Sequence, residues 1–284
     1  MKLLTFHIGK RLSYGAMKDG RVVDLGARLG DDIPDLKSLI GRGLEQVPAL
    51  LDASGPGLDP GEIIFAPVIP NPAKILCAGL NYEDHRLEVG LEKAKYPGFF
   101  VRFADSQMGH GTPVVLPRVS RKVDYEGELA VIIGKAGRYI PVEQALEHVA
   151  GYACYQDASV RDWQGHSTQF TAGKNFPATG GFGPWLVTPE ELPALSSLTL
   201  ETRLNGQVMQ HASLSQMIFP VPELLSYLSQ FTVLSAGDVI ITGTPAGVGF
   251  VRKPRLYLAP GDVVEVEISG LGTLRHPVVA EEEQ

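Results

Sequence analysis

The stretch that most limits the fold is VDYEGELAVIIG, residues 123 to 134, in which carboxylates interrupt an otherwise apolar, β-branched run. Side chains of a strand alternate between its two faces, so Glu126, Glu128 and Ala130 point the same way. The residues after Glu128 are apolar on both faces, which is typical of a central strand. The chain therefore needs a sheet that can bury two adjacent carboxylates.

Two buried carboxylates on one face repel each other, because burial and like charge both raise the pKa of a carboxyl group. Downstream, the run GYACYQD ends a second apolar segment at Asp157. Three carboxylates offer hard oxygen ligands of the kind that suits Mg²⁺ or Mn²⁺. The sequence thus predicts a divalent-cation site at Glu126, Glu128 and Asp157.

A plainer interpretation places both glutamates on an exposed edge strand, since exposed glutamate is common. Their partners would then be Arg121, Lys122 or Arg161.

The segment ILCAGLNYEDHRLEVG places His85 three residues before Glu88, just after an apolar strand. A short helix over 82–89 would put the two side chains on one face, within reach of each other. A histidine oriented by a carboxylate can take a proton from water near neutral pH. The alternative is a surface histidine with an ordinary ion pair on a helix face.

Taken one at a time, the other polar residues indicate little about the function. Lys174 follows a glycine in a Gly/Pro-rich region, which suggests a solvated lysine on a loop, and Arg102 in GFFVRF suggests a plain surface charge. The same holds for Gln164, Thr244 and Arg161.

Composition limits the partners and the location. The net charge of −7 disfavours nucleic acid and anionic membranes as partners, because both would repel the chain. Nowhere do about 18 apolar residues run uninterrupted, and the first 20 residues become polar too early for a signal peptide, so we expect a soluble, cytoplasmic protein. Cys77 and Cys154 lie in apolar runs, which predicts buried thiols rather than a cysteine zinc site.

The pattern along the chain predicts an α+β protein that is mostly β. Pro- and Gly-rich loop chemistry between 52 and 74 suggests a boundary near residue 70, giving a small N-terminal domain, 1–70, and a larger domain, 71–284. Strands do not alternate regularly with helices, so a mixed, curled β architecture fits better than a doubly wound parallel sheet. The predicted strands are 2–8, 12–18, 21–25, 74–79, 113–116, 123–133, 151–156, 184–187, 198–204, 238–242 and 262–268, and the predicted helices are 34–42, 44–51, 141–150 and 221–231.

Several motifs, in order, resemble the fumarylacetoacetate hydrolase superfamily over roughly residues 72–280. They are AGLNYEDH, VDYEGELAVIIG, YQDASVRDWQ, AGKN, GFGPWLV, TRLNGQVMQ and AGDVIITGTPAGVG. The resemblance implies a mixed β-roll catalytic domain behind a small N-terminal α+β domain, usually as a homodimer, with one Mg²⁺, Mn²⁺ or Ca²⁺.

By motif position, the resemblance also implies residue roles. Glu126, Glu128 and Asp157 take the metal-ligand places, and His85 with Glu88 matches a water-activating pair. Lys174 matches a catalytic lysine, Gln164 and Thr244 match substrate contacts, and Arg161 falls beside the metal carboxylates. The run after Lys174 departs from many acylpyruvate-cleaving relatives, which carry a small hydroxyl residue and an acidic one where this chain has Asn175 and Phe176.

The family's substrates imply a 2-oxo acid as the small-molecule partner. The leading expectation is hydrolysis of the C3–C4 bond of an acylpyruvate such as maleylpyruvate or fumarylpyruvate, from aromatic-compound catabolism, with Lys174 stabilising the oxyanion. The alternatives use the same enolate chemistry: oxaloacetate decarboxylation, isomerisation or decarboxylation of a hydroxymuconate-type diacid, keto–enol tautomerisation, or dehydration of a sugar acid. A binding protein without turnover is a further class, against which the intact set of polar residues weighs.

Overall fold

The N-terminal part forms a three-stranded meander with short helices beside it. The computed structural model describes residues 1–53 and 55–282. Asp19 and Gly20 have φ angles of 50° and 76°, so they make the tight turn between the second and third strands. These elements are β1 (Lys2–Ile8), β2 (Arg11–Lys18), β3 (Arg21–Asp24), α1 (Gly26–Leu29), α2 (Leu36–Arg42) and α3 (Val47–Asp52).

The main sheet has eleven strands and runs through the whole molecule. Its path is β3-β2-β1-β13-β11-β10-β16-β5-β6, with β4 paired to β1 and β7 paired to β13. Most pairs are antiparallel, while β16 with β5 and β13 with β7 are parallel. The remaining bounds are β4 (Ile64–Phe65), β5 (Ile75–Gly79), β6 (Gly98–Val101), β7 (Gln107–Met108), β10 (Gly127–Ile133), β11 (Val149–Asp157), β13 (Gly180–Val187) and β16 (Val239–Ile241).

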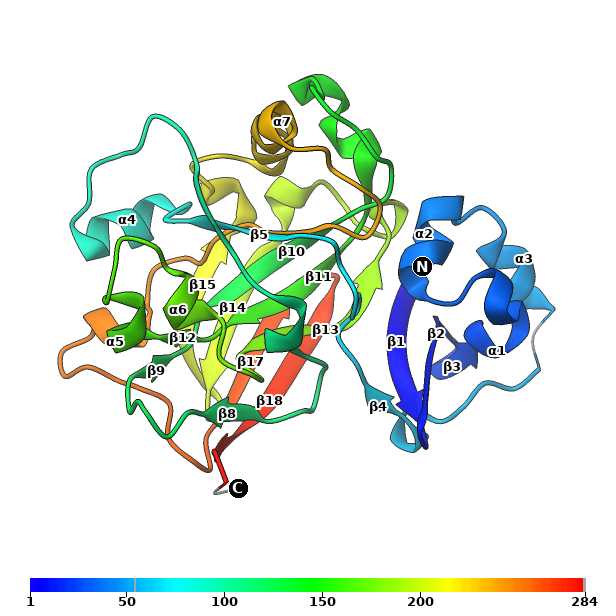
Figure 1. The fold of residues 1–284 in the computed structure, drawn as a ribbon, viewed down its shortest axis with the longest axis horizontal. Coiled ribbons are helices and arrows are strands. Elements are labelled where there is room, and N and C mark those ends of the chain that lie inside the picture. The colour runs from blue at the N-terminus through cyan, green and yellow to red at the C-terminus, as the bar shows by residue number, and fades with distance from the viewer. Residues whose placement is uncertain (54, 283–284) are drawn as a thin grey trace.

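A second sheet of five strands packs against the middle of the main sheet (Figure 1). Leu129 and Val131 of β10 share one apolar core with Leu200 and Val266 of this sheet. Its order is β15-β14-β17-β18-β8, with bounds β15 (Gln207–Ser213), β14 (Thr199–Leu204), β17 (Val263–Ile268), β18 (Gly272–Ala280) and β8 (Val114–Leu116). Two curled, mixed sheets with few helices confirm the predicted α+β, mostly β fold.

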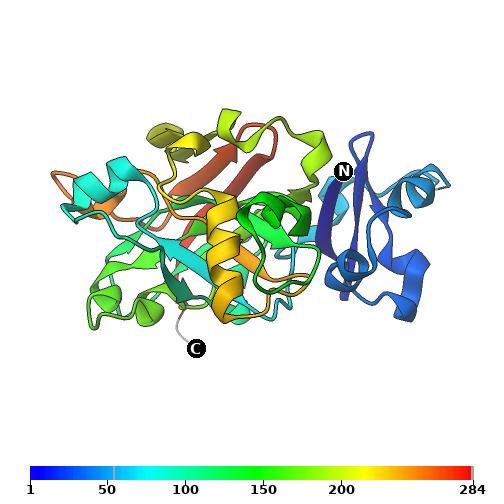
Figure 2. The same cartoon turned by 90° about the horizontal axis from the view of Figure 1, so that it is seen from above.

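The N-terminal strands continue the main sheet. Lys2 and Leu3 of β1 pair with Val187 and Leu186 of β13. Figure 1 and Figure 2 nevertheless place residues 1 to 52 in a lobe at one side of the molecule. The division into 1–70 and 71–284 stays a prediction.

Short helices cover the larger part and carry site residues. They are α4 (Glu83–Val89), α5 (Arg161–Gln164), α6 (Thr171–Lys174) and α7 (Val221–Phe231), and a two-stranded pair joins β9 (Val123–Asp124) to β12 (Ser159–Val160). The 3-10 helices with three residues are 30–32, 60–62, 104–106, 189–191, 195–197, 214–216 and 249–251.

Two predicted elements were wrong in detail. The helix expected over 141–150 is a 3-10 helix, Val142–His148, and Val149 already begins β11. Of its apolar residues, Ala145 is buried in the core but Val142 and Leu146 are exposed, so the apolar face is too narrow to hold an α-helix there. The strand expected over 123–133 is divided, because neither β9 nor β10 includes Tyr125 and Glu126.

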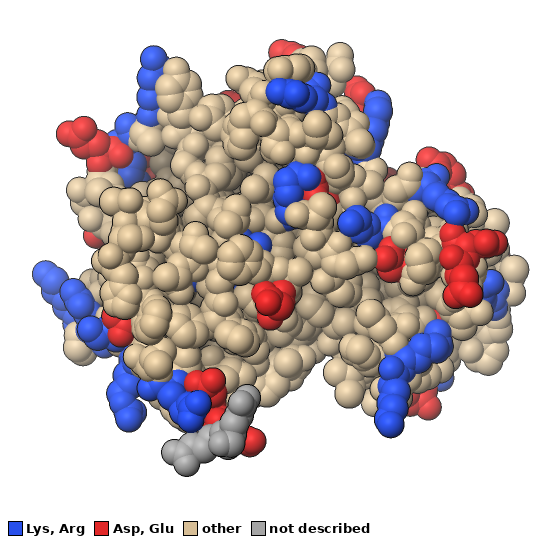
Figure 3. Space-filling view, in the orientation of Figure 1, with Lys and Arg blue, Asp and Glu red and all other residues tan. Residues whose placement is uncertain are grey.

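On the face drawn in Figure 3, acidic and basic side chains are scattered singly or in small groups, and much of the surface carries neither. In residues 1–53 and 55–282, no helix combines the length and apolarity needed to cross a bilayer.

The core against α7 gives a stability prediction. Leu225 of α7 is fully buried in the core shared by both sheets, so Leu225→Ala should lower the free energy of unfolding by about 2–5 kcal/mol. Gln230→Ala, at an exposed position of the same helix, should change it by less than about 0.5 kcal/mol. Urea unfolding measures both, and equal effects would contradict the assigned packing.

Candidate metal centre

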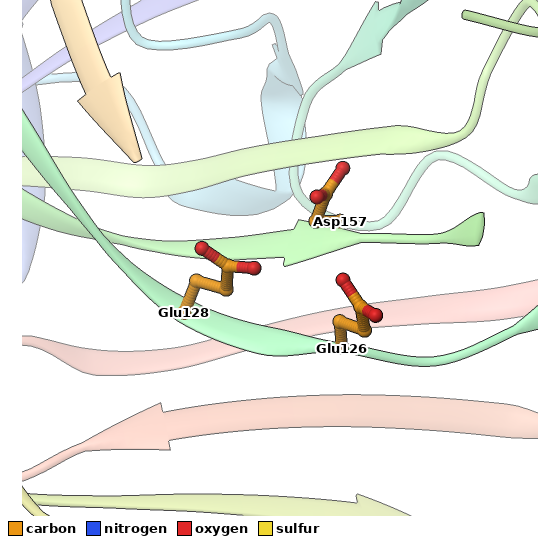
Figure 4. A group of neighbouring side chains, drawn as sticks. All are labelled: Glu126, Glu128 and Asp157. Carbon is orange, nitrogen blue, oxygen red and sulfur yellow. The ribbon is translucent and has the colours of Figure 1, made fainter. Parts of the chain in front are cut away.

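Two neighbouring strands bring the three predicted carboxylates together. Gly127 of β10 pairs with Gln156 of β11, and the N–H of Asp157 donates to the carbonyl of Glu126 at 2.8 Å. One oxygen from each of Glu126, Glu128 and Asp157 lies within 4.8 Å of those of the other two, and all three residues are buried. Figure 4 shows the three carboxylates on one side of these adjacent segments.

Close packing explains why a glycine stands between the two glutamates. A Cβ at Gly127 would lie 2.0 Å from Thr202 Oγ1 of the facing sheet. The alternation of the strand therefore turns the glutamates to one side and leaves only a hydrogen on the crowded side.

Lys174 lies between two of these carboxylates. Its Nζ is 2.6 Å from Glu126 Oε2 and 2.6 Å from Asp157 Oδ2. Burial lowers the pKa of Lys174, but Asp157 and Glu126 outweigh this and raise it above its usual value. The expectation of a solvated loop lysine was wrong, because Lys174 ends α6 and only 2% of it is exposed.

Two arginines complete the cationic side of the cluster. Arg161 Nη2 is 2.7 Å from Glu126 Oε1 and 2.8 Å from Asp124 Oδ2. Burial raises the pKa of Glu126, yet Lys174 and Arg161 together hold it at about 2. Arg102, expected to be a surface charge, is buried and donates to Asp157 Oδ1 and, at 2.6 Å, to Thr179 Oγ1.

Glu128 differs from the other carboxylates in its partners. No lysine, arginine or histidine in the described ranges forms an ion pair with it, and its Oε2 accepts only the N–H of Gly243, at 2.6 Å. Burial, reinforced by Asp157 and Glu126, raises the pKa of Glu128 well above its usual value. Within the described chain the cluster sets four carboxylates against three cations: Asp124, Glu126, Glu128 and Asp157 against Arg102, Arg161 and Lys174.

This excess of negative charge fits a divalent cation. The donor set is all oxygen, as Mg²⁺ and Mn²⁺ prefer. An ionised carboxylate has about four lone-pair sites, so the contacts of Glu126 and Asp157 with lysine and arginine leave further sites on each. The residues present therefore fit a hard divalent cation, and Glu128 is the ligand whose charge most needs one.

A histidine and a glutamate stand beside the cluster. The helix predicted over 82–89 is α4, and His85 Nδ1 lies 2.7 Å from Glu88 Oε1. The N–H of Gly247 donates to Glu88 Oε2 at 3.0 Å. When Nδ1 carries the proton donated to Glu88, Nε2 is left as a free acceptor, which is the arrangement of a general base.

One cavity of about 330 Å³ joins His85, of the His85–Glu88 dyad, to Glu126 and Glu128, while Glu88 and Asp157 are not among its lining residues. His85, Glu126, Glu128, Arg161, Gln164, Lys174 and Thr244 all line it. Gln164 accepts from Arg161 at 3.0 Å, and Thr244 donates to the carbonyl of Gly127 at 3.0 Å. The apolar part of the lining consists mainly of Val89, Leu91, Phe100, Phe170 and Phe250.

Sequence reasoning missed two members of the cluster, Arg102 and Asp124. Asp124 lies two residues before Glu126, so strand alternation alone signals a third carboxylate on that side. Arg102 carries no local signal, because its partner Asp157 is 55 residues away.

The raised pKa of Glu128 gives a pH prediction. The folded, metal-free chain keeps a proton on Glu128 that the unfolded chain releases, so its stability should fall as the pH rises above the usual glutamate range. Denaturant unfolding from about pH 5 to about pH 8 measures this, and Glu128→Gln should remove that part of the slope. Saturating Mn²⁺ should also remove it, because the cation replaces the proton. Parallel pH profiles for wild type and Glu128→Gln would contradict the assignment.

Comparisons with known proteins agree with the fold. The family model for "Fumarylacetoacetate (FAA) hydrolase C-terminal" matches residues 74–279. Oxaloacetate tautomerase FAHD2A, mitochondrial, from Homo sapiens is 38% identical, covering 98% of this chain and 92% of the relative.

Two solved structures share nearly the whole fold. A putative HpcE protein from Mycobacterium smegmatis has a TM-score of 0.88 and 36% identity, covering 99% of this chain and 100% of the other. Maleylpyruvate hydrolase from Sphingobium sp. SYK-6, solved with manganese(II) and pyruvate, has a TM-score of 0.83 and 27% identity, with the same coverage. The match over residues 74–279 and the near-complete likeness to these relatives show that the chain belongs to the fumarylacetoacetate hydrolase family.

Proposed function

We propose that this protein is a divalent-metal-dependent enzyme that moves a proton at C3 of a 2-oxo acid, with oxaloacetate keto–enol tautomerisation as the leading reaction. The observation that carries the proposal is the cavity that His85, held by Glu88, lines together with Glu126 and Glu128. A base and an acidic cation site on one cavity are the two parts that enolisation needs.

A divalent cation held by Glu126, Glu128 and Asp157 would supply the positive charge that stabilises an enolate. With all four carboxylates ionised the cluster has one negative charge in excess, so a divalent cation that replaces the proton of Glu128 would leave one positive charge in excess. That charge favours the carboxylate of a 2-oxo acid in a cavity with low dielectric. His85 Nε2 takes the proton from C3, and the proton is delivered to the oxygen at C2, so no bond between heavy atoms breaks.

The position of Lys174 favours proton transfer over hydrolysis. Hydrolysis of an acylpyruvate needs a donor for the oxyanion that forms at C4. Lys174 instead forms ion pairs with Glu126 and Asp157, and these ion pairs would have to break before it could serve as that donor. The likeness to oxaloacetate tautomerases, at 38% identity over nearly the whole chain, also supports this order of candidates.

The dyad gives the direct test. With Mn²⁺-loaded protein, the near-ultraviolet absorbance of enol-oxaloacetate should decay faster than in buffer, and His85→Ala should lower this rate about 100-fold or more. Glu88→Gln should lower it by a smaller factor, because the imidazole remains but loses its carboxylate.

His211→Ala is the matched control, since His211 is exposed and pairs with Glu201 away from the cavity. It should keep the wild-type rate. The proposal would be contradicted if the tautomerisation rate stayed at the wild-type level both in His85→Ala and after a chelator had removed the metal.

Hydrolysis of an acylpyruvate is the second candidate, favoured by the size and apolar wall of the cavity. A four-carbon diacid does not need the surface formed by Val89, Leu91 and Phe170. Water would add its hydroxyl to the acyl carbon and a proton to C3, which breaks the C3–C4 bond and gives pyruvate and a carboxylic acid.

Product analysis separates the two candidates. Mn²⁺-loaded protein incubated with acylpyruvates should release stoichiometric pyruvate if it is a hydrolase, and His85→Ala should abolish this release. Loss of the enol band without pyruvate would rule hydrolysis out for that substrate, and gas release from oxaloacetate would identify a decarboxylase instead.

A further inference from the structure

One loop holds acidic residues of both the dyad and the metal centre. The segment GTPAGVGF, residues 243 to 250, follows β16 and leads into the 3-10 helix at 249–251. The N–H of Gly243 donates to Glu128 at 2.6 Å, and the N–H of Gly247 donates to Glu88 at 3.0 Å. The path of this backbone therefore sets where both carboxylates lie.

Asp124 fastens the far end of the same loop. Its Oδ1 accepts the N–H of Gly249 at 2.8 Å, and its Oδ2 accepts the N–H of Phe250 at 3.0 Å. Arg161 donates to Oδ2 from Nε at 2.9 Å, and its Nη2 also contacts Glu126. The Phe250 ring covers the Arg161 guanidinium at 4.4 Å, so the loop touches the arginine on two sides.

The loop has little freedom to follow another path. Gly247 has a φ of 105°, and a Cβ there would lie 2.1 Å from the carbonyl oxygen of Met209. Since the backbone is tightly packed at this point, a change at its Asp124 anchor shifts the neighbouring N–H groups rather than being absorbed locally.

We propose that Asp124 is a positioning residue that ties the 243–250 loop to Arg161, and so keeps the His85–Glu88 dyad in register with the metal ligands. Both of its oxygens are taken by backbone N–H groups and Arg161, and it lies outside the group of three carboxylates that can share one cation. The inference rests on the proposed metal-dependent function, but its binding and exchange readouts need no substrate.

The test compares Asp124→Asn with Asp238→Asn. Asparagine keeps one acceptor oxygen but places an NH₂ donor against the donors that meet the other oxygen, so the loop anchor is weakened with little change in volume. Asp238 is a matched control, because it is also fully buried, pairs with Lys74 at 2.8 Å and accepts the N–H of Ser235 at 2.7 Å. It precedes β16, whereas the loop follows that strand.

Asp124→Asn should lower kcat at saturating Mn²⁺ by about tenfold or more and weaken Mn²⁺ binding by about tenfold, as substitutions behind metal ligands do. KM should change less than kcat, because the substrate-facing groups remain. Hydrogen exchange of the 243–250 amides should become faster. Asp238→Asn should leave all of these within about twofold of wild type, even if both variants lose similar thermal stability.

The proposal is overturned if Asp124→Asn keeps wild-type Mn²⁺ affinity, kcat and loop exchange, or if Asp238→Asn changes them as much. If wild type binds Mn²⁺ but turns over no 2-oxo acid, the proposed function fails, while affinity and exchange still decide the role of Asp124. Should Asp124→Asn not fold, wild-type exchange decides it: amides of Gly249 and Phe250 that exchange as fast as exposed loop amides would exclude the anchor.

Discussion

A buried cluster in which carboxylates outnumber cations is the constraint on which the centre of this protein depends. Burying one unpaired carboxylate is costly, and burying several together is possible only with cations or protons among them. Arg102, Arg161 and Lys174 neutralise most of the cluster, and Glu128 remains without a cationic partner among the described residues. The fold thus prepares a site that is stable enough to form yet still favours a further positive charge.

The same cations limit what the site can do. Because Lys174 and Arg161 are engaged with Glu126, they shape the ligand set instead of lying free in the cavity. In the proposed function the acid–base work falls to His85, whose partner Glu88 is held by a backbone N–H from the loop after β16. The candidate metal ligands and the proposed base therefore depend on one continuous network of strands, loop and buried arginine.

Local patterns predicted the parts of the site that lie close together in sequence. Strand alternation placed Glu126 and Glu128 on one side, and the i, i+3 spacing placed His85 beside Glu88. The break in the strand at Glu126 and the 3-10 helix at 142–148 were not predicted, because neighbouring chain segments rather than local propensity decide them.

Contacts between segments that are distant in the sequence could not be predicted from local sequence patterns. Lys174 and Arg102 each looked solvated, and only the folded sheet brings them to Asp157. The family resemblance predicted from motif order that Lys174 belongs to the site, but it predicted no role for Arg102 or Asp124. The continuity of the N-terminal strands with the main sheet was likewise not visible in the sequence, since it depends on the pairing of β1 with β13.

Anomalous diffraction from crystals grown with Mn²⁺ tests the central claim most directly. The account predicts a single strong peak within coordination distance of Glu126, Glu128 and Asp157 oxygens, about 2.0–2.3 Å away. A map with no peak there, and with Lys174 still bridging Glu126 and Asp157, would contradict it.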